Sequence, residues 1–215
     1  LQVTEGERKI THSSAYAEGL VELQDASSQA AMERLEIPRG ARVLDYCAGG
    51  GGKLLAMASR ADGTWFAHDI APGRMTDLPA RAARAGIHVT RLETGELAAS
   101  APFDLVLCDV PCTGSGTWRR TPEAKWRLTP DRLAELTRIQ SDILRQAATL
   151  VAPNGCLAYT TCSVLAAENQ AVIEQFCKAH QEWTVTDTRH WPVSPTGDGF
   201  FISQMRRHGG CRDQP

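Results

Sequence analysis

The feature that most constrains the fold is a regular alternation of short apolar runs with stretches whose apolar residues recur at helical spacing. The apolar runs predict strands at Ala41–Tyr46, Thr64–Asp69, Ile87–Leu92, Phe103–Asp109 and Cys156–Thr160. The intervening stretches predict helices at Ala26–Glu36, Lys53–Arg60, Gly73–Ala85, Pro130–Val151 and Ala167–Ala179. This alternation is typical of an α/β fold, a mostly parallel sheet with helices on both faces. Two last strands, predicted at Trp183–Asp187 and Phe200–Arg206, complete a seven-stranded sheet with a C-terminal antiparallel hairpin.

The length of 215 residues suits one such domain with its own core. We expect this domain to span residues 24–207, with an N-terminal extension at residues 1–23 and a tail at residues 208–215. The chain begins with Leu1 rather than Met, so we expect a preceding region to be missing. No apolar run reaches the roughly 20 residues of a membrane-spanning helix, and no leader sequence is present. We therefore expect a cytoplasmic protein.

The chain has seven cysteines, none in a Cys-x-x-Cys pair and none near histidines at zinc-finger spacing. This pattern predicts reduced thiols and no bound metal.

A glycine loop, Cys47-Ala48-Gly49-Gly50-Gly51-Gly52-Lys53, lies between the first predicted strand and the helix that follows it. Consecutive glycines let the backbone turn sharply and approach a ligand closely. The helix N-terminus favours an anionic group such as a cofactor carboxylate. A phosphate-binding P-loop is excluded, because Leu54 follows the lysine. A tight strand-to-helix turn with no ligand is the alternative interpretation.

Asp69, at the end of the second predicted strand, is well placed to accept hydrogen bonds from ribose hydroxyls. This suits a dinucleotide as well as S-adenosylmethionine, and a solvated surface acid is the alternative.

Two cysteines follow neighbouring strands. Cys112 lies in the segment Asp109-Val110-Pro111-Cys112, and Cys162 lies in Thr160-Thr161-Cys162-Ser163. Because the carboxyl ends of parallel strands meet at one edge of a sheet, we expect both thiols to face one pocket. A lone unpaired cysteine is most often a small buried hydrophobe. Two of them at strand ends, each beside Thr, Ser or Pro, favour a reactive site.

Five motifs occur together and in order. They are QDASSQ at 24–29, DYCAGGGGK at 45–53, FDLVLCDVPCTGSGTWRRTPEAKWR at 103–127, YTTCS at 159–163 followed by Glu168-Asn169, and DGFF at 198–201. Together they resemble the Sun/RsmB family of RNA cytosine-5 methyltransferases, from about Gln24 to Arg206. The resemblance implies a Rossmann-like class I methyltransferase fold, S-adenosylmethionine as cofactor, and an enzyme that makes 5-methylcytosine in RNA.

The resemblance also implies roles for individual residues. Cys162 would be the nucleophile that adds to carbon 6 of cytosine, and Cys112 would help to resolve the covalent adduct. Asp109 would hydrogen-bond the cytosine edge and lie close to the methionine end of the cofactor. The residues implied in cofactor binding are Cys47, Ala48, Gly49, Gly50, Gly51, Gly52, Lys53, Asp69 and Asp109.

Three positions depart from the family pattern. Gly50 stands where the family has proline, and Leu54 where it has threonine. Gly95 stands where the family commonly has an aspartate that meets the adenine, with Thr94 and Glu96 as neighbouring substitutes. We expect weaker cofactor binding than in relatives, which a titration with the cofactor tests.

The net charge of -2 is not that of an average nucleic-acid binder, so RNA binding requires a local basic segment. Such a segment follows Cys112, and two tryptophans interleave with its cations. Cations for phosphates and an aromatic for an unpaired base suit single-stranded RNA. A solvated loop with buried tryptophans is the alternative interpretation. The predicted RNA-binding residues are Arg119, Arg120, Lys125, Trp126 and Arg127.

Other functions fit the sequence less well. An amino-methyltransferase needs an aromatic in the motif after the fourth strand, and a DNA cytosine-5 methyltransferase lacks the threonine-cysteine motif. A nicotinamide dehydrogenase has no use for two cysteines. A non-catalytic RNA-binding or ribosome-assembly protein on the same fold remains the alternative. We expect an RNA partner, ribosomal RNA ahead of transfer RNA, no membrane or metal, and a monomer.

Overall fold

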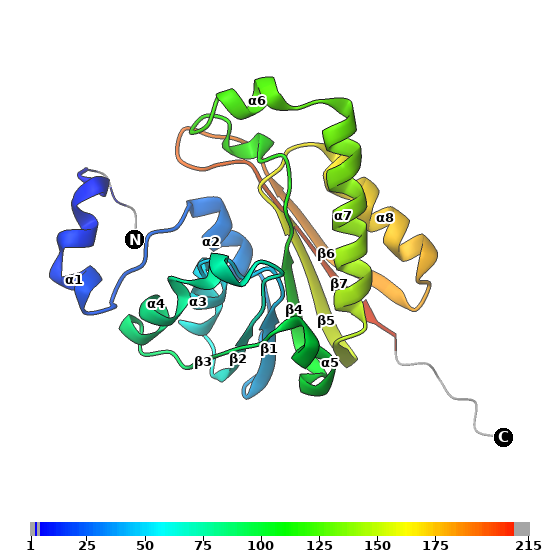
Figure 1. The fold of residues 1–215 in the computed structure, drawn as a ribbon, viewed down its shortest axis with the longest axis horizontal. Coiled ribbons are helices and arrows are strands. Elements are labelled where there is room, and N and C mark those ends of the chain that lie inside the picture. The colour runs from blue at the N-terminus through cyan, green and yellow to red at the C-terminus, as the bar shows by residue number, and fades with distance from the viewer. Residues whose placement is uncertain (1–2, 4, 209–215) are drawn as a thin grey trace.

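The computed structural model describes residue 3 and residues 5–208. Its centre is a seven-stranded sheet in the order β3-β2-β1-β4-β5-β7-β6 (Figure 1). The strands are β1 (Ala41–Asp45), β2 (Gly63–Ala67), β3 (Val89–Arg91), β4 (Phe103–Asp109), β5 (Val151–Thr161), β6 (Trp183–Trp191) and β7 (Phe200–Arg207). The first five strands pair in parallel, and β7 runs antiparallel between β5 and β6. The predicted parallel sheet and its C-terminal antiparallel hairpin are confirmed.

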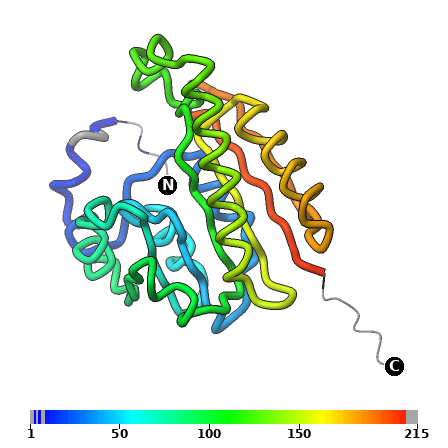
Figure 2. Tube along the Cα trace, turned by 45° about the vertical axis from the view of Figure 1, so that its right-hand side comes forward, coloured from blue at the N-terminus to red at the C-terminus, as the bar shows by residue number. Residues whose placement is uncertain are grey.

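Helices cover both faces of the sheet, with α7 and α8 on one face and α2, α3 and α4 on the other (Figures 1 and 2). The α-helices are α1 (Ser14–Ala17), α2 (Ala26–Glu33), α3 (Gly52–Ala58), α4 (Leu78–Arg84), α5 (Leu97–Ser100), α6 (Glu123–Arg127), α7 (Pro130–Ala148) and α8 (Gln170–Ala179). Short 3-10 helices are η1 (Glu7–His12), η2 (Pro72–Met75), η3 (Thr94–Glu96), η4 (Ser115–Thr117) and η5 (Ala166–Glu168). Among the described helices, none has the length and apolar character that a bilayer crossing demands.

The core consists of two layers, one on each face of the sheet. On one face Leu144 of α7 and Phe176 of α8 pack with Val106 of β4, and on the other Leu54 of α3 packs with Leu105. Successive side chains of a strand point to opposite faces, so a strand buried on both sides is apolar throughout. This is the reason why LVLC at 105–108, within β4, is one continuous apolar run, whereas Asp104 near the start of the strand is exposed.

Some predicted boundaries differ from the structure. The helix predicted at Gly73–Ala85 is split into η2 and α4, because Pro79 lies in the first turn of α4, where its missing N–H is not needed. The helix predicted at Ala26–Glu36 ends at Glu33. The strand predicted at Cys156–Thr160 begins already at Val151, and its pairing with β4 contains an irregularity near Asn154, whose φ is 63°. The segment after Cys112, predicted as a loop, contains α6.

The N-terminal extension lies against α4, on the side of the sheet away from α8 (Figure 2). The Tyr16 ring faces the Arg84 guanidinium at 4.0 Å, and the Glu22 carboxylate forms ion pairs with Arg81 at 3.4 Å and Arg84 at 2.5 Å. At Gly19 the φ angle is +75°, and a Cβ atom would lie 1.8 Å from the Arg84 carbonyl oxygen. The extension therefore contacts α4 backbone to backbone at Gly19. Residues 209–215 of the predicted tail lie outside the described residues.

We expect Gly19→Ala to loosen the extension from α4, because alanine is strained at this φ and has no room against Arg84. The expected loss of stability is on the order of 1–3 kcal/mol. Thermal unfolding and limited proteolysis of residues 1–23 measure it. Gly73→Ala is the control, because no atom lies within 4 Å of a Cβ at that position. Equal stability and protease resistance of the two variants would contradict the close approach at Gly19.

Candidate active site

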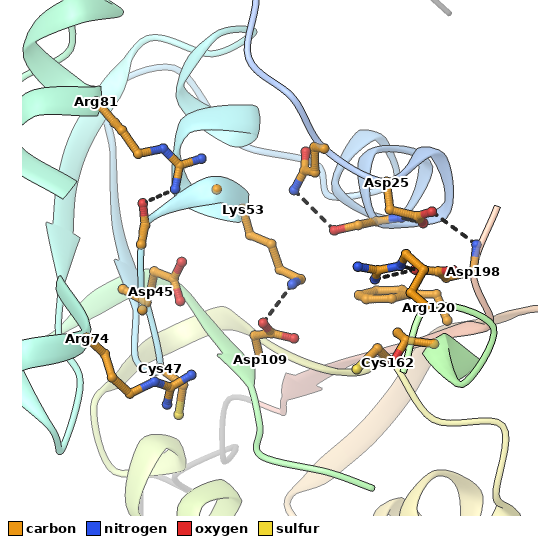
Figure 3. Close-up of a pocket in the computed structure, with 18 residues that line it drawn as sticks. Asp25, Asp45, Cys47, Lys53, Arg74, Arg81, Asp109, Arg120, Cys162 and Asp198 are labelled. Atoms are coloured by element: carbon orange, nitrogen blue, oxygen red, sulfur yellow. Dashed lines mark hydrogen bonds and ion pairs between the residues drawn. The ribbon is translucent and has the colours of Figure 1, made fainter. Parts of the chain in front are cut away.

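A cavity of about 340 Å³ lies at the carboxyl edge of β1, β4 and β5 (Figure 3). Its walls come from the glycine loop, the ends of these strands, the start of α2 and the segment before β7. The residues lining it are Gln24, Asp25, Ser28, Asp45, Cys47, Ala48, Gly49, Gly50, Gly52, Lys53, Arg74, Arg81, Asp109, Thr117, Arg120, Cys162, Asp198 and Phe200. All five sequence motifs, which are far apart along the chain, thus meet at one site through these residues.

The structure brings the two cysteines into contact, with 3.4 Å between the Sγ atoms of Cys112 and Cys162. This follows from register, because Asp109 pairs with Thr160 and both chains leave the sheet at the same edge. Cys162 lines the cavity described above, whereas Cys112 lines a second cavity of about 560 Å³ beside α6 and α7. The two thiols therefore touch each other but face different cavities.

The contact makes the two thiols chemically different. The hydrogen bond from Cys112 lowers the pKa of Cys162, and the nearby Lys53 ammonium lowers it further. The same hydrogen bond, together with burial, raises the pKa of Cys112 well above its usual range. Cys162 is thus the thiol of the pair that ionises more readily. Thiolate is the nucleophilic form of cysteine.

A half-buried ion pair lies beside Cys162. The Lys53 ammonium, from the end of the glycine loop, contacts the Asp109 carboxylate at 2.6 Å (Figure 3). Thr160 Oγ1 donates to the other oxygen of Asp109 at 3.1 Å. Burial alone would lower the pKa of Lys53, but the Asp109 carboxylate raises it above its ordinary value. The lysine therefore stays charged at the site.

Asp45, at the end of β1, is an acid that sequence reasoning passed over. It lines the cavity, is 1% exposed, and its Oδ1 has no hydrogen-bond partner among the described residues. Burial raises the pKa of Asp45 to about 7, with a further contribution from the Asp109 carboxylate. A buried acceptor without a partner is rare in proteins, so this oxygen is suited to a cationic ligand group. Asp45 is the first residue of the motif at 45–53, so its position in that motif could have identified it as a site residue.

Helix α4 packs against the glycine loop. Arg81 donates to the Gly50 carbonyl, and a Cβ at Gly51, where φ is +79°, would lie 2.2 Å from Leu78 Cδ1. The second and third glycines of the loop, Gly50 and Gly51, thus allow the approach of the loop to α4. The sequence held no signal for Arg81, because its contact depends on how α4 packs.

Asp69 follows β2 and is nearly buried. One carboxylate oxygen accepts from Gly49 N at 3.1 Å and meets Arg74 at 3.3 Å, and the other accepts from Ala71 N at 3.0 Å. In this structure Asp69 holds the glycine loop through its bond to Gly49. A hydrogen bond from a ribose hydroxyl to Asp69 remains a prediction. The next residue, Ile70, is 78% exposed and offers an apolar surface beside it.

The two substitutes named for the missing adenine-contacting acid make local hydrogen bonds. Glu96 accepts from Glu93 N at 2.8 Å in a capping box that starts η3. Thr94 Oγ1 lies 3.1 Å from His68 Nε2.

Of the predicted RNA-binding residues, two are held by an acid that the sequence left unassigned. Arg119 and Arg120 contact the Asp198 carboxylate at 3.3 Å and 2.9 Å, and Asp198 is 2% exposed. Asp198 N in turn donates to Asp25 at 3.0 Å, so the 24–29 and 198–201 motifs meet here (Figure 3). Arg120 lines the cavity near Cys162.

The other three predicted residues lie on α6. Trp126 is 82% exposed, with Lys125 Nζ at 5.4 Å from its ring, and Arg127 lines the second cavity. The alternative of a buried tryptophan is therefore wrong for Trp126. The second cavity is lined by Cys112, Thr113, Thr121, Glu123, Ala124, Arg127, Leu128, Arg132 and Leu136.

Comparison with known proteins gives the family. Residues 32–206 match the family model described as 16S rRNA methyltransferase RsmB/F. The chain is 33% identical over 225 residues to a probable ribosomal RNA small subunit methyltransferase B of Synechocystis, covering 92% of this chain and 50% of that protein. It is 34% identical over 206 residues to ribosomal RNA small subunit methyltransferase B of Salmonella arizonae, covering 88% and 48%. The chain thus spans about half the length of these relatives.

Solved structures agree with the fold. A methyltransferase homolog protein from Pyrococcus horikoshii aligns with a TM-score of 0.79 and 26% identity, covering 95% of this chain and 73% of that one. NSun6 from Pyrococcus horikoshii, solved with SFG, aligns with a TM-score of 0.80 and 20% identity, covering 93% and 56%, and supports the fold alone. With four fifths of its residues inside the family model, this chain belongs to the RsmB/F family of 16S rRNA methyltransferases.

Proposed function

We propose that this chain is the catalytic part of an RNA cytosine-5 methyltransferase that uses S-adenosylmethionine and acts on ribosomal RNA, as a monomer in the cytoplasm. The observation that carries the proposal is the contact of 3.4 Å between Cys162 and Cys112 beside the Lys53–Asp109 ion pair. A thiolate nucleophile, a second thiol that helps to resolve the adduct and a charged pair at one strand edge suit covalent cytosine-5 methylation.

The cavity fits S-adenosylmethionine in size and charge. Pockets for small ligands begin at roughly 300 Å³, and this cavity reaches about 340 Å³. The cofactor carries an ammonium and a sulfonium, and Asp45 offers a buried acceptor without a partner. The exposed side chain of Ile70 offers an apolar face for the adenine. When bound, the cofactor supplies an electrophilic methyl group.

Cys162 starts the reaction. Its thiolate forms a bond to carbon 6 of cytosine, and the electron pair of the carbon 5–carbon 6 double bond moves to carbon 5, which takes the methyl group. Asp109 hydrogen-bonds the edge of the base, and Lys53 keeps the negative charge of Asp109 in place. A target within a helix must first leave its stack.

Cys112 completes the reaction. The hydrogen bond to Cys162 is the largest cause of the raised pKa of Cys112, and it is lost once Cys162 is bonded to the base. The Cys112 proton can then pass to solvent in the second cavity, and its thiolate accepts the carbon 5 proton. The carbon 5–carbon 6 double bond re-forms, and the bond to Cys162 breaks with the electron pair returning to sulfur.

The test is transfer of labelled methyl groups from S-adenosylmethionine to small-subunit ribosomal RNA, with the product identified as 5-methylcytosine. Transfer RNA in a parallel reaction distinguishes the two classes of substrate. Cofactor binding without transfer to any RNA, by this chain and by the full-length protein, would instead support the non-catalytic assembly protein.

We expect cofactor affinity to rise between pH 6 and pH 8, because Asp45, with a pKa of about 7, becomes charged over this range and attracts the cofactor cations. The ionised fraction grows from about one tenth to about nine tenths, so the Kd falls by up to about tenfold. Isothermal titration calorimetry at the two pH values measures it. Asp45→Asn should flatten the pH dependence. A wild-type Kd that does not change with pH would remove Asp45 from cofactor binding.

We expect Lys125→Ala combined with Arg127→Ala to weaken binding of single-stranded RNA, because both cations lie on α6 beside the second cavity. The loss should reach roughly tenfold at low salt and shrink as salt is added. Filter binding at two salt concentrations measures it, with unchanged cofactor affinity as the check on the fold. Arg119→Ala combined with Arg120→Ala should also weaken RNA binding, but it additionally leaves the buried Asp198 unpaired.

A further inference from the structure

A buried carboxylate that no step of the proposed reaction uses lies behind the two cysteines. Glu168, in η5, is 0% exposed. Its carboxylate accepts hydrogen bonds from Thr113 N at 2.9 Å, Thr113 Oγ1 at 2.6 Å, Gln140 Nε2 at 2.9 Å and Ser163 Oγ at 2.5 Å. All four donors are neutral. A buried carboxylate without a cation is costly to keep, so its place beside a reactive pair demands a functional reason.

Three of these donors belong to the loops that carry the cysteines, and the fourth, Gln140, lies on α7. Thr113 directly follows Cys112, and Ser163 directly follows Cys162. One side chain, Glu168, therefore ties the loop after β4 to the loop after β5, immediately beside the position where the two thiols meet.

Further hydrogen bonds hold the residues that precede and follow each cysteine. Gln140, which donates to Glu168, also donates from Nε2 to the Pro111 carbonyl at 2.9 Å. Asn169 accepts from Thr161 Oγ1 at 2.6 Å and donates to the Ser163 carbonyl at 2.9 Å. Each cysteine is thus held on both sides by Glu168 and its two polar neighbours, Gln140 and Asn169. Within this network, Gln140 Oε1 has no hydrogen-bond partner among the described residues.

We propose that Glu168 is a positioning residue that makes the two cysteines unequal: it holds their thiols in contact, and its negative charge keeps Cys112 as the thiol that donates to the Cys162 thiolate. The hydrogen bond between the thiols needs one proton, and a charge beside Cys112 decides that Cys112 retains it. The assignment of reaction roles rests on the proposed function, but the difference between the thiols does not.

The charges around the pair support this assignment. The Cys162 thiol interacts with the charges of Asp109, Lys53 and Arg120, two of which are cations. Cys112 interacts with the Glu168 carboxylate and with the buried Tyr159 hydroxyl. The raised pKa of Cys112 comes first from the hydrogen bond to Cys162, then from burial and the charge of Cys162, and the Glu168 carboxylate makes a smaller contribution in the same direction.

The experiment is alkylation of the chain by iodoacetamide between pH 5 and pH 10, with Cys162 and Cys112 quantified in separate peptides by mass spectrometry. In the wild type we expect Cys162 to react at lower pH than Cys112. In Glu168→Gln the gap between the two titration midpoints should narrow by about one pH unit or more, a tenfold change in the relative rates at neutral pH. Glu168→Asp keeps the negative charge but has a side chain shorter by one methylene group. It should retain more of the difference between the two titration midpoints than Glu168→Gln does.

A second pair of variants covers the case in which Glu168→Gln does not fold. Thr113→Val removes one donor to Glu168 and leaves the carboxylate in place, and we expect slower alkylation of Cys162 at neutral pH. Thr113→Ser retains the hydroxyl and should restore the wild-type rate. Thr188→Val, which removes a hydrogen bond to Ser203 in the β6–β7 hairpin, is the matched control with no expected effect on either thiol.

The outcomes separate this inference from the proposed function, because alkylation needs neither RNA nor cofactor. The role of Glu168 is overturned if a folded Glu168→Gln variant shows the wild-type difference between the two titration midpoints. It is also overturned if Cys162 is alkylated at the wild-type rate in Thr113→Val. Both conclusions hold even if the wild type methylates RNA. A narrowed gap supports the role even if no RNA is methylated. In an active enzyme, the pH profile of methyl transfer by Glu168→Asp should move to higher pH, which a merely structural role would not produce.

Discussion

Cys162→Ala will form no covalent complex with RNA that contains 5-fluorocytosine at the target position. The fluorine cannot leave as a proton does, so a working enzyme stays bonded to carbon 6 of the base through its nucleophile. Cys162 is the thiol of lowered pKa beside Lys53, and alanine removes the only atom of this side chain that can form the bond. Removal of a nucleophile typically costs roughly 10³-fold or more in turnover. A band that survives denaturing electrophoresis, present for wild type and absent for Cys162→Ala, is the expected measurement.

Cys112→Ala, tested in the same trapping experiment, separates the roles of the two cysteines. Cys112 contacts Cys162 at 3.4 Å and acts only after the adduct exists. This variant should therefore form the complex even with ordinary cytosine, because elimination is slowed. If trapping were lost in Cys112→Ala and kept in Cys162→Ala, the two roles would have to be exchanged.

Lys53→Met will give the second largest loss of activity. The lysine is 2.6 Å from Asp109 and is the cation that lowers the pKa of Cys162. Methionine has a similar length and no charge, so the thiolate fraction of Cys162 falls and Asp109 loses its partner. We expect a loss of about 10²–10⁴-fold in methyl transfer, as for other residues that control proton and charge placement.

The measurement is the single-turnover rate of methyl transfer as a function of pH. For Lys53→Met the rate should recover in part at higher pH, because Cys162 then ionises without help. Lys178→Met, at an exposed lysine of α8, is the control for loss of a single positive charge. A uniform loss at every pH would instead place Lys53 in cofactor or base binding rather than in activation of the thiol.

The sequence alone allowed much of the fold to be predicted, because apolar periodicity is a local property. The apolar run at 105–108 favoured a strand buried on both faces, and the glycines at 49–52 indicated a sharp turn between a strand and a helix. Boundaries were less accurate where one residue changes the local geometry, as Pro79 does at the start of α4.

The sequence by itself also determined that Cys112 and Cys162 lie at one edge of the sheet, since each follows a strand whose carboxyl end points the same way. Which of the two thiols ionises more readily depends on contacts that form only in the folded chain. That difference depends on Lys53, Glu168 and the contact between the thiols, which join residues about 5 to 110 positions apart. The pairing of Arg120 with Asp198 has the same origin, at a separation of 78 residues. Hydrogen bonds and ion pairs of this kind act over a few ångströms in space and leave no periodic pattern along the chain.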